Sequence, residues 1–331
     1  EEQFGWRVDE ICPNALKLLD SEDLHCLRAA RHQAFKQQRA VTRADLRSEL
    51  ALREIAAILR CDLTLTISEY EMALLQDEYS VPASQLLYVP FLIERDETLP
   101  RVEFALRQHC CFIGNFRHEP NWQAVLQLRR IWPQIRKQLP GVELHIYGAY
   151  PPPKATELHD VKLGFLIKGW ADDSLQVLAQ SRLCLAPIPF GAGLKGKFID
   201  AMLTGTPSVT TAIGAEAMTE PQTGQWCGIV AETDAEIIAA TVQLYQHADL
   251  WHQAQQCGDA ILQNRFAKSA LLPMIWQRME QVRQELLAHR LQHFLGSMLK
   301  HHHQRSTKFM AQWIEAKNKL AQQVTEEQAN D

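Results

Sequence analysis

Residues 186–202 read Ala-Pro-Ile-Pro-Phe-Gly-Ala-Gly-Leu-Lys-Gly-Lys-Phe-Ile-Asp-Ala-Met. They predict the end of a strand, a glycine loop, and a helix that begins near Lys195. Glycines let backbone N–H groups approach an anion closely, and a helix N-terminus adds about half a positive charge. Lys195 and Lys197 add cations where they oppose the helix dipole, so we expect an anionic partner, and a diphosphate fits best. Asp200 follows one turn later, where a carboxylate can accept hydrogen bonds from a ribose or sugar hydroxyl.

This loop differs from the two common phosphate-binding motifs. It does not match the P-loop pattern G-x-x-x-x-G-K-[ST]. Gly191, Gly193 and Gly196 do have the G-x-G-x-x-G spacing of dinucleotide-binding proteins, but they follow a late strand of their domain, and no acidic residue follows a paired strand about 20 residues on. The alternative is a tight strand-to-helix turn whose lysines are merely solvated, and the spacing alone leaves it open.

Short apolar segments alternate with helical segments on both sides of the loop. We expect strands at residues 15–19, 63–67, 86–89, 110–113, 142–147, 163–168, 183–187, 208–211 and 228–230. Helices are expected between them, one capped at Thr42 with Asp45, one begun by a Ser68 and Glu71 capping box, and a nearly continuous run from residue 234 that Pro273 breaks. The alternation predicts parallel βαβ units, hence an α/β fold.

Composition narrows the class of protein and its partners. The 331 residues are 46% hydrophobic with a net charge of −5, so the chain is globular and has no overall basic field for a nucleic acid polymer. The 8 cysteines contain no C-x-x-C pair, which argues against zinc and disulfides and for reduced thiols. No apolar run reaches the roughly 18 residues of a membrane span, and the acidic start is unlike a signal peptide. We therefore expect a cytoplasmic protein; peripheral contact with the inner face of a membrane stays open.

Glycine is distributed unevenly along the chain. Of 15 glycines, only Gly5 precedes Gly114. A ligand loop lined by backbone groups is therefore expected in the second part of the chain. The charged segment 96–109 is expected to be a linker between two domains, residues 1–95 and 110–265, followed by a helical extension, residues 266–331.

Residues 111–264 resemble the C-terminal, donor-binding domain of GT-B glycosyltransferases of the family 4 type (glycosyl transferases group 1). The segments that carry the resemblance are residues 112–116, 120–121, 131–133, 169–170, 191–197, 200–202, 205–207 and 213–216. Residues 19–25 with Arg28 and Arg31, and residues 67–69, resemble the later part of the family's N-terminal domain. The resemblance implies two Rossmann-like domains that face each other across a cleft, the first of them incomplete, with C-terminal helices that cross back onto it.

The resemblance also implies a function and a set of site residues. The expected reaction is retaining transfer of a sugar from a nucleotide-diphosphate sugar to a glycan or lipid-linked acceptor, in bacterial polysaccharide or glycoconjugate synthesis. Neither a metal nor a cofactor is expected. The expected catalytic residues are His25, for the transferred sugar or the acceptor proton, and Asp200. Donor contacts are expected from Lys195 and Lys197, from the N–H groups of Gly193 and Leu194, and from Gly114, Asn115, Arg117, Trp170 and Gly191.

Two departures from the family pattern keep alternatives open. The family's E-x7-E pair appears as Ala192 and Asp200, which favours a site dominated by lysines. Only about 95 residues precede the linker, so the chain is expected to lack the start of its first domain. A non-catalytic nucleotide-sugar-binding or scaffold protein and a GT-B-like sugar-nucleotide epimerase are the alternatives. For single residues, Arg117 as a surface arginine, Trp170 as a core indole, His25 as a structural histidine and residues 300–305 as a solvated helix face are the simpler interpretations.

Overall fold

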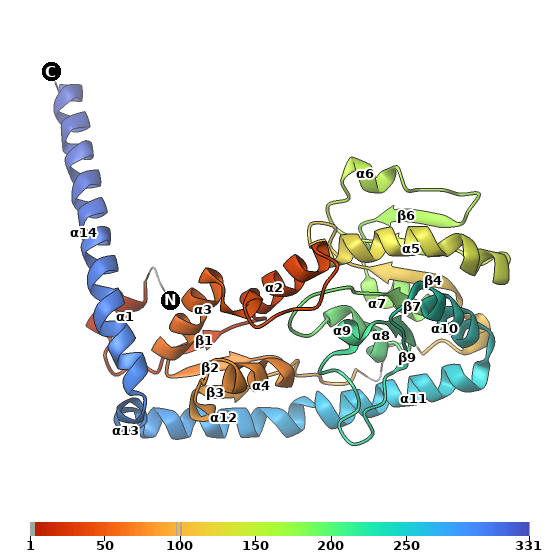
Figure 1. Ribbon diagram of the computed structural model, residues 1–331, viewed down its shortest axis with the longest axis horizontal. Helices are drawn as coiled ribbons and strands as arrows, with labels where there is room; N and C mark the ends of the chain where they lie inside the picture. The colour runs from red at the N-terminus through yellow and green to blue at the C-terminus, as the bar shows by residue number, and fades with distance from the viewer. Residues whose placement is uncertain (1–3, 97, 100, 331) are drawn as a thin grey trace.

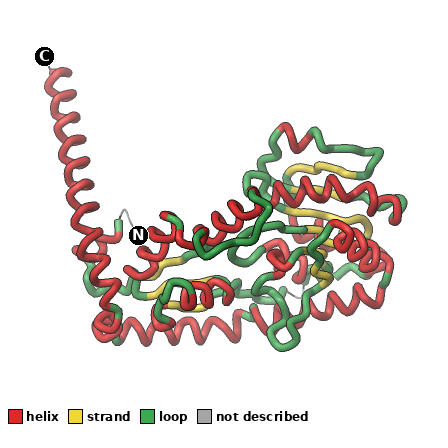
Figure 2. Tube along the Cα trace, in the orientation of Figure 1, coloured by secondary structure: helices red, strands yellow, loops and turns green. Residues whose placement is uncertain are grey.

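The computed structural model describes residues 4–96, 98–99 and 101–330, except for the side chains of residues 302–308, 311, 321 and 323–330. Its strands form two separate parallel sheets (Figure 2). The first sheet has the order β1-β2-β3, with β1 (Leu18–Asp20), β2 (Leu63–Thr66) and β3 (Leu86–Tyr88). Helices α1 (Gly5–Ile11), α2 (His25–Lys36), α3 (Glu49–Arg60) and α4 (Glu69–Asp77) belong to the same part of the chain, which we call the first domain.

The second sheet has six strands in the order β6-β5-β4-β7-β8-β9. They are β4 (Gln108–Ile113), β5 (Leu144–Tyr147), β6 (Phe165–Gly169), β7 (Ser181–Ala186), β8 (Ser208–Thr210) and β9 (Gly228–Val230). The chain moves outward from β4 to β6 and then returns to β7 on the other side of β4. In an open parallel sheet this reversal leaves a crevice at the carboxyl ends of the two strands, here β4 and β7.

Helices cover this sheet and close the core of the second domain. They are α5 (Glu119–Gln138), α6 (Pro153–Thr156), α7 (Ser174–Gln180), α8 (Gly196–Leu203), α9 (Ala212–Ala215), α10 (Asp234–Gln246) and α11 (Ala248–Arg265). The central strands β4 and β7 contain apolar runs, residues 110–113 and 183–186, as expected for strands whose two faces are covered. One stripe of α5, which includes Trp122, Leu128 and Trp132, packs on them as its helical spacing predicts.

The C-terminal helices return to the first domain. In Figure 1, α11 and α12 (Lys268–Gln284) run along the lower edge of both domains, and α13 (Leu286–Gln292) leads into the long α14 (Phe294–Asn330). Arg290 binds the Asp62 carboxylate through Nε at 2.8 Å, and His289 Nε2 contacts the Asp62 carbonyl oxygen at 2.8 Å. The helical extension expected from the sequence is therefore present and crosses back onto the first domain. None of the described helices is both long and apolar enough to cross a membrane.

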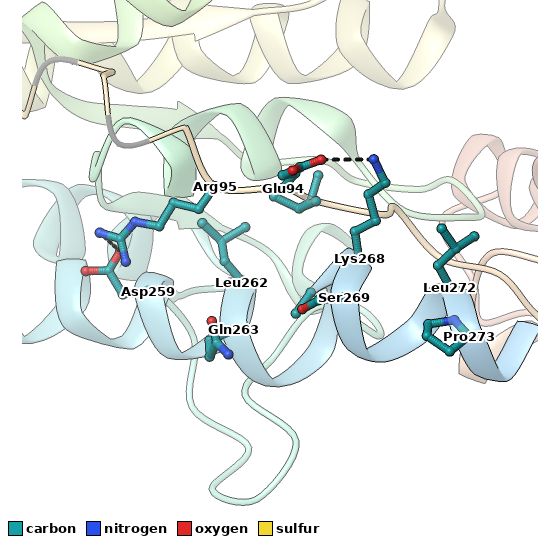
Figure 3. A pocket seen from close by; sticks show the side chains of 11 residues that line it. Glu94, Arg95, Asp259, Leu262, Gln263, Lys268, Ser269, Leu272 and Pro273 are labelled. Carbon is teal, nitrogen blue, oxygen red and sulfur yellow. Dashed lines mark hydrogen bonds and ion pairs between the residues drawn. The ribbon is translucent and has the colours of Figure 1, made fainter.

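The linker and the helical region meet beneath the two domains. Ile93 N–H donates to the Phe266 carbonyl at 2.8 Å, and Lys268 N–H donates to the Ile93 carbonyl at 2.9 Å. Figure 3 shows the pocket beside this junction, where Lys268 pairs with Glu94 and Arg95 points toward Asp259. The chain passes between the domains twice, near Ile93 and again between α11 and α12, and these two segments are hydrogen-bonded to each other.

Three local expectations were wrong. The helical run breaks at residues 266–267, where it pairs with Ile93, whereas Pro273 lies inside α12. Ser48 caps α3 by accepting the Ala51 N–H at 3.3 Å; the Thr42 and Asp45 pair precedes that helix and does not cap it. No capping box begins α4, because the Glu71 carboxylate turns away from Ser68 and reaches another part of the molecule.

Candidate functional site

A pocket of about 440 Å³ lies between the two domains, at the carboxyl ends of β4 and β7. The first domain contributes Glu22, Asp23, His25 and Arg28 to its lining. The second domain contributes His118, Pro120, Asn121, Ile188, Phe190 and the whole loop from Gly191 to Lys197. The glycine loop identified in the sequence therefore forms one wall of a pocket at the topological switch point, where ligands bind in such sheets.

Gly193 shows why this loop requires glycine. Its φ is +61°, a left-handed conformation that side chains disfavour. A Cβ atom at Gly193 would lie 2.8 Å from the Cβ of Asp23, so the loop is in close contact with the first domain here. The Gly193 N–H donates to Glu71 Oε1 at 2.8 Å. The sequence had assigned this N–H to a phosphate, and in the structure a carboxyl group of the first domain accepts it.

The two lysines of the loop are partly buried and lack carboxylate partners. Lys195 Nζ donates to the Gly193 carbonyl at 2.8 Å, and Lys197 Nζ donates to Asn121 Oδ1 at 2.6 Å. Lys197 Nζ also lies 4.4 Å from the centre of the Phe112 ring. Burial lowers the pKa of each ammonium to about 8. Within the described part of the chain neither lysine forms an ion pair, so the pocket holds two cations that an anion would stabilise.

The first domain faces these lysines with a small polar cluster. Asp23 Oδ2 accepts a hydrogen bond from Arg28 at 2.6 Å, and Asp23 Oδ1 lies 3.4 Å from His25 Nε2. The His25 side chain is 55% exposed. On the opposite side lies His118, whose pKa is lowered by desolvation and then by Arg28 and Lys197. The cluster supplies an imidazole held by a carboxylate and directed at the cleft.

Two predicted site residues lie behind the pocket wall and act through Asn121. The Asn115 carbonyl accepts a hydrogen bond from Asn121 Nδ2 at 3.0 Å. A Cβ atom at Gly114 would lie 2.7 Å from the Asn121 side chain, so this glycine makes room for it. Gly114 and Asn115 therefore orient the residue that binds Lys197.

Like Gly114 and Asn115, three further predicted residues do not line this pocket. Arg117 stacks on the Tyr150 ring, with 3.9 Å between the guanidinium carbon and the ring centre, which agrees with the simpler surface interpretation. Trp170 is 69% exposed, which contradicts its interpretation as a core indole. Asp200 lies on α8, where its carboxylate accepts a 3.4 Å hydrogen bond from Ser174 and burial raises its pKa. The structure thus brings together His25, Gly191, Gly193, Leu194, Lys195 and Lys197, and not Asp200.

Sequence reasoning missed several residues of the site. The sequence predicted no role in the site for Asp23, His118 or Asn121, and it placed Glu71 in a capping box. The one available signal was that Asp23, Asn121 and Arg31 belong to segments that carry the family resemblance. Their contacts join positions far apart in the chain, which spacing cannot reveal.

His109, Glu143 and His145 form the one cluster of metal-ligating side chains found among the described residues. It lies at the starts of β4 and β5, away from the pocket. His109 Nδ1 accepts the Glu143 N–H at 3.1 Å, so the neutral ring carries its proton on Nε2, and Lys168 and Arg136 repel added positive charge. We therefore assign this cluster a structural role.

Comparisons with known proteins agree with this fold. Residues 107–247 match the family model described as glycosyl transferases group 1. A mutant of S. aureus TarM in complex with UDP superposes with a TM-score of 0.59 at 14% identity, covering 70% of this chain and 46% of that one. Sucrose-phosphate synthase from Thermosynechococcus elongatus gives 0.57 at 19%, covering 86% and 71%. Anabaena HepE in complex with UDP and glucose gives 0.55 at 14%, covering 85% and 83%. The chain thus spans about half the length of TarM. No curated protein matches it in sequence.

Proposed function

Because residues 107–247 match the family model described as glycosyl transferases group 1 and the chain has the GT-B fold that the sequence predicted, we propose that this protein transfers a sugar from a nucleotide-diphosphate sugar to an acceptor hydroxyl. The observation that carries the proposal is the pair of partly buried lysines that lack an ion pair among the described residues, in a pocket at the switch point of the sheet. A diphosphate would supply the missing negative charge.

The residues of the pocket suit departure of a nucleoside diphosphate. Negative charge develops on the diphosphate as the sugar leaves, and preorganised cations and N–H groups stabilise it. Lys195, Lys197 and the positively polarised N-terminus of α8 would supply that stabilisation. His25, held near Asp23, would hydrogen-bond the sugar or accept the acceptor proton. Retention at the anomeric carbon and independence from a metal ion are parts of the proposal.

The donor and acceptor classes are proposed from the relatives. The TarM and HepE structures are complexes with UDP, so a uridine diphosphate sugar is the first donor to test. We propose a glycan or lipid-linked glycan as the acceptor, with peripheral contact at a membrane surface. The exposed Phe309, Trp313 and Leu320 of α14 support that contact, because aromatic and aliphatic side chains on a polar helix suit a membrane interface.

The test measures binding and turnover separately on the full chain. Calorimetry with UDP and GDP is expected to show binding by the wild type and a loss of about 10- to 100-fold in Lys197→Met, since a hydrogen bond to a charged group contributes about 1.5–3 kcal/mol. Lys137→Met, an exposed lysine of α5, is the matched control and should bind normally. Equal binding by all three proteins would overturn the donor-site assignment.

Turnover distinguishes the remaining alternatives. Release of UDP from UDP-glucose or UDP-N-acetylglucosamine in the presence of glycan acceptors is the result expected of a transferase. Tight nucleotide binding with no release under any acceptor would favour the non-catalytic alternative. A changed sugar nucleotide recovered without acceptor would favour the epimerase.

A further inference from the structure

The first domain holds the glycine loop by its backbone. Three successive residues of the loop make contacts with this domain. The Gly191 carbonyl accepts a hydrogen bond from Arg31 at 2.7 Å, the Ala192 methyl packs against the hydrophobic cluster of the first domain, and the Gly193 N–H donates to Glu71 Oε1 at 2.8 Å. Since these residues have no side chain beyond one methyl group, backbone groups are the sole directional contacts available.

Glu71 is fully buried, with 0% of its surface exposed. Its Oε1 accepts a second hydrogen bond, from the Leu24 N–H at 3.0 Å, so it joins the loop to the start of α2. Its Oε2 has no hydrogen-bond partner among the described residues. Burial raises the pKa of this carboxyl, although the hydrogen bonds from the Leu24 and Gly193 N–H groups act in the opposite direction. The carboxyl group that α4 places beneath the loop thus accepts hydrogen bonds from two backbone N–H groups, one in each domain.

Arg31 contacts the other end of the segment Gly191–Gly193, at the Gly191 carbonyl. Its guanidinium forms two hydrogen bonds to the Glu216 carboxylate, at 2.8 and 2.6 Å, and lies over the Tyr70 ring at 4.9 Å. Glu216 follows α9 in the second domain, and Tyr70 is the neighbour of Glu71 on α4. Arg31 therefore fixes the loop carbonyl against both domains, with the bidentate geometry that lysine cannot reproduce.

We propose that Glu71 and Arg31 are positioning residues for the donor loop, holding Gly191 and Gly193 in the geometry that presents Lys195 to a diphosphate. The connection is direct: Glu71 fixes the N–H of Gly193, and the carbonyl of Gly193 accepts the hydrogen bond from Lys195 Nζ at 2.8 Å. Neither residue lines the pocket. The inference rests on the proposed function and adds that donor affinity depends on first-domain side chains that do not touch the donor.

The test compares two substitutions of similar size. Glu71→Gln keeps an acceptor at the Oε1 position, whereas Glu71→Leu removes it and leaves the Gly193 and Leu24 N–H groups unpaired. We expect Glu71→Leu to weaken UDP binding about tenfold, the effect of one or two lost hydrogen bonds, and Glu71→Gln to stay within about threefold of the wild type. Glu69→Leu, an exposed position on the same helix, is the control and should bind as the wild type does.

A double-substitution cycle separates positioning from general destabilisation. If Glu71 acts through Lys195, the Glu71→Leu effect on the dissociation constant should shrink to about twofold or less in a Lys195→Met background, because coupled residues are not additive. The full tenfold loss in both backgrounds, or wild-type binding by Glu71→Leu, overturns the proposal. If Glu71→Leu fails to fold, Arg31→Lys takes its place in the same cycle with the same expectation.

A separate experiment distinguishes failure of the proposed function from failure of the proposed loop contacts. If wild-type protein binds neither UDP nor GDP, the donor-site assignment fails, and hydrogen exchange of the amides in residues 190–197 then tests the loop contacts alone. Faster exchange in Glu71→Leu than in Glu71→Gln supports the hold on the loop. Equal exchange in both variants overturns it.

Discussion

Lys197 Nζ donates a hydrogen bond of 2.6 Å to Oδ1 of Asn121, and Nδ2 of the same amide donates to the Asn115 carbonyl at 3.0 Å. The second bond fixes which way the amide faces, so its oxygen must point toward the lysine. A neutral oxygen positions the ammonium without cancelling its charge. The structure therefore keeps one full positive charge at the pocket wall.

The substitution Asn121→Asp tests this reasoning, because it changes the charge of the partner and almost nothing else. A carboxylate beside Lys197 would neutralise it and raise its pKa. We expect UDP binding to weaken about tenfold, on the scale of one charge-assisted contact, while thermal stability stays equal or rises. Calorimetry and a melting curve measure the two effects. Asn318→Asp, on the exposed face of α14, is the control; unchanged UDP affinity in Asn121→Asp would contradict the role given to Lys197.

The site was predictable where its chemistry lies in consecutive residues. Lys195 and Lys197 follow a glycine loop, and this pattern was sufficient to place them at a helix N-terminus, where the structure shows them lining a pocket. Glu71 could not be found in this way, because its partner Gly193 lies 122 positions along the chain and the local pattern at Ser68 suited a helix cap. Asp200 has the spacing expected of a site residue, but it does not line the pocket because its place on α8 directs it toward Ser174.

The protein should take up protons when it binds a nucleotide at alkaline pH. The pKa of Lys195 and of Lys197 is lowered to about 8 by burial, so both are charged at about pH 6.5 and increasingly neutral above pH 8. A bound diphosphate favours the charged forms and raises both pKa values. Affinity should therefore be highest below about pH 7 and fall as the pH rises through 8 and beyond. Calorimetry at about pH 8.5 in two buffers of different ionisation enthalpy measures the uptake, which Lys197→Met should reduce. Equal heats in the two buffers would show that these lysines do not titrate with binding.

The positions of the strands and of the break in the C-terminal helices were predictable to different degrees. The apolar runs gave the strands of this domain to within a few residues, since buried parallel strands need continuous apolar segments. Residues 15–19 were displaced from β1 (Leu18–Asp20), because three ladder positions carry too little pattern to fix a register. The break in the C-terminal helices was misplaced at Pro273 because it depends on pairing with Ile93, which lies far away in the sequence.

Arg107 is expected to be important for stability, away from the pocket. It is fully buried, and its guanidinium donates to Thr206 Oγ1 at 2.6 Å, to the Thr204 carbonyl at 2.6 Å and to the Val102 carbonyl at 2.7 Å. Arg107→Met leaves these acceptors without donors, which should cost about 3 kcal/mol in the free energy of unfolding. Arg130→Met removes an exposed arginine paired with Asp234 and should cost less than about 1 kcal/mol. Urea unfolding measures both, and equal losses would contradict the account.

Alanine substitutions at two glycines of similar backbone conformation distinguish the effect of backbone strain from the effect of contact between the domains. Gly193 and Gly224 have φ values of +61° and +70°, so alanine at either position costs about 1–2 kcal/mol in backbone strain. A Cβ atom at Gly224 would meet no atom within 4 Å, whereas at Gly193 it would lie 2.8 Å from Asp23 Cβ. Gly224→Ala should therefore lose stability and keep its UDP affinity. Gly193→Ala should lose similar stability and also bind UDP about tenfold more weakly, the equivalent of about 1.4 kcal/mol, because the added methyl group must push Asp23 and the first domain away from the loop. If calorimetry gave both variants the wild-type affinity, close contact between Asp23 and the loop would not be a condition for binding the donor.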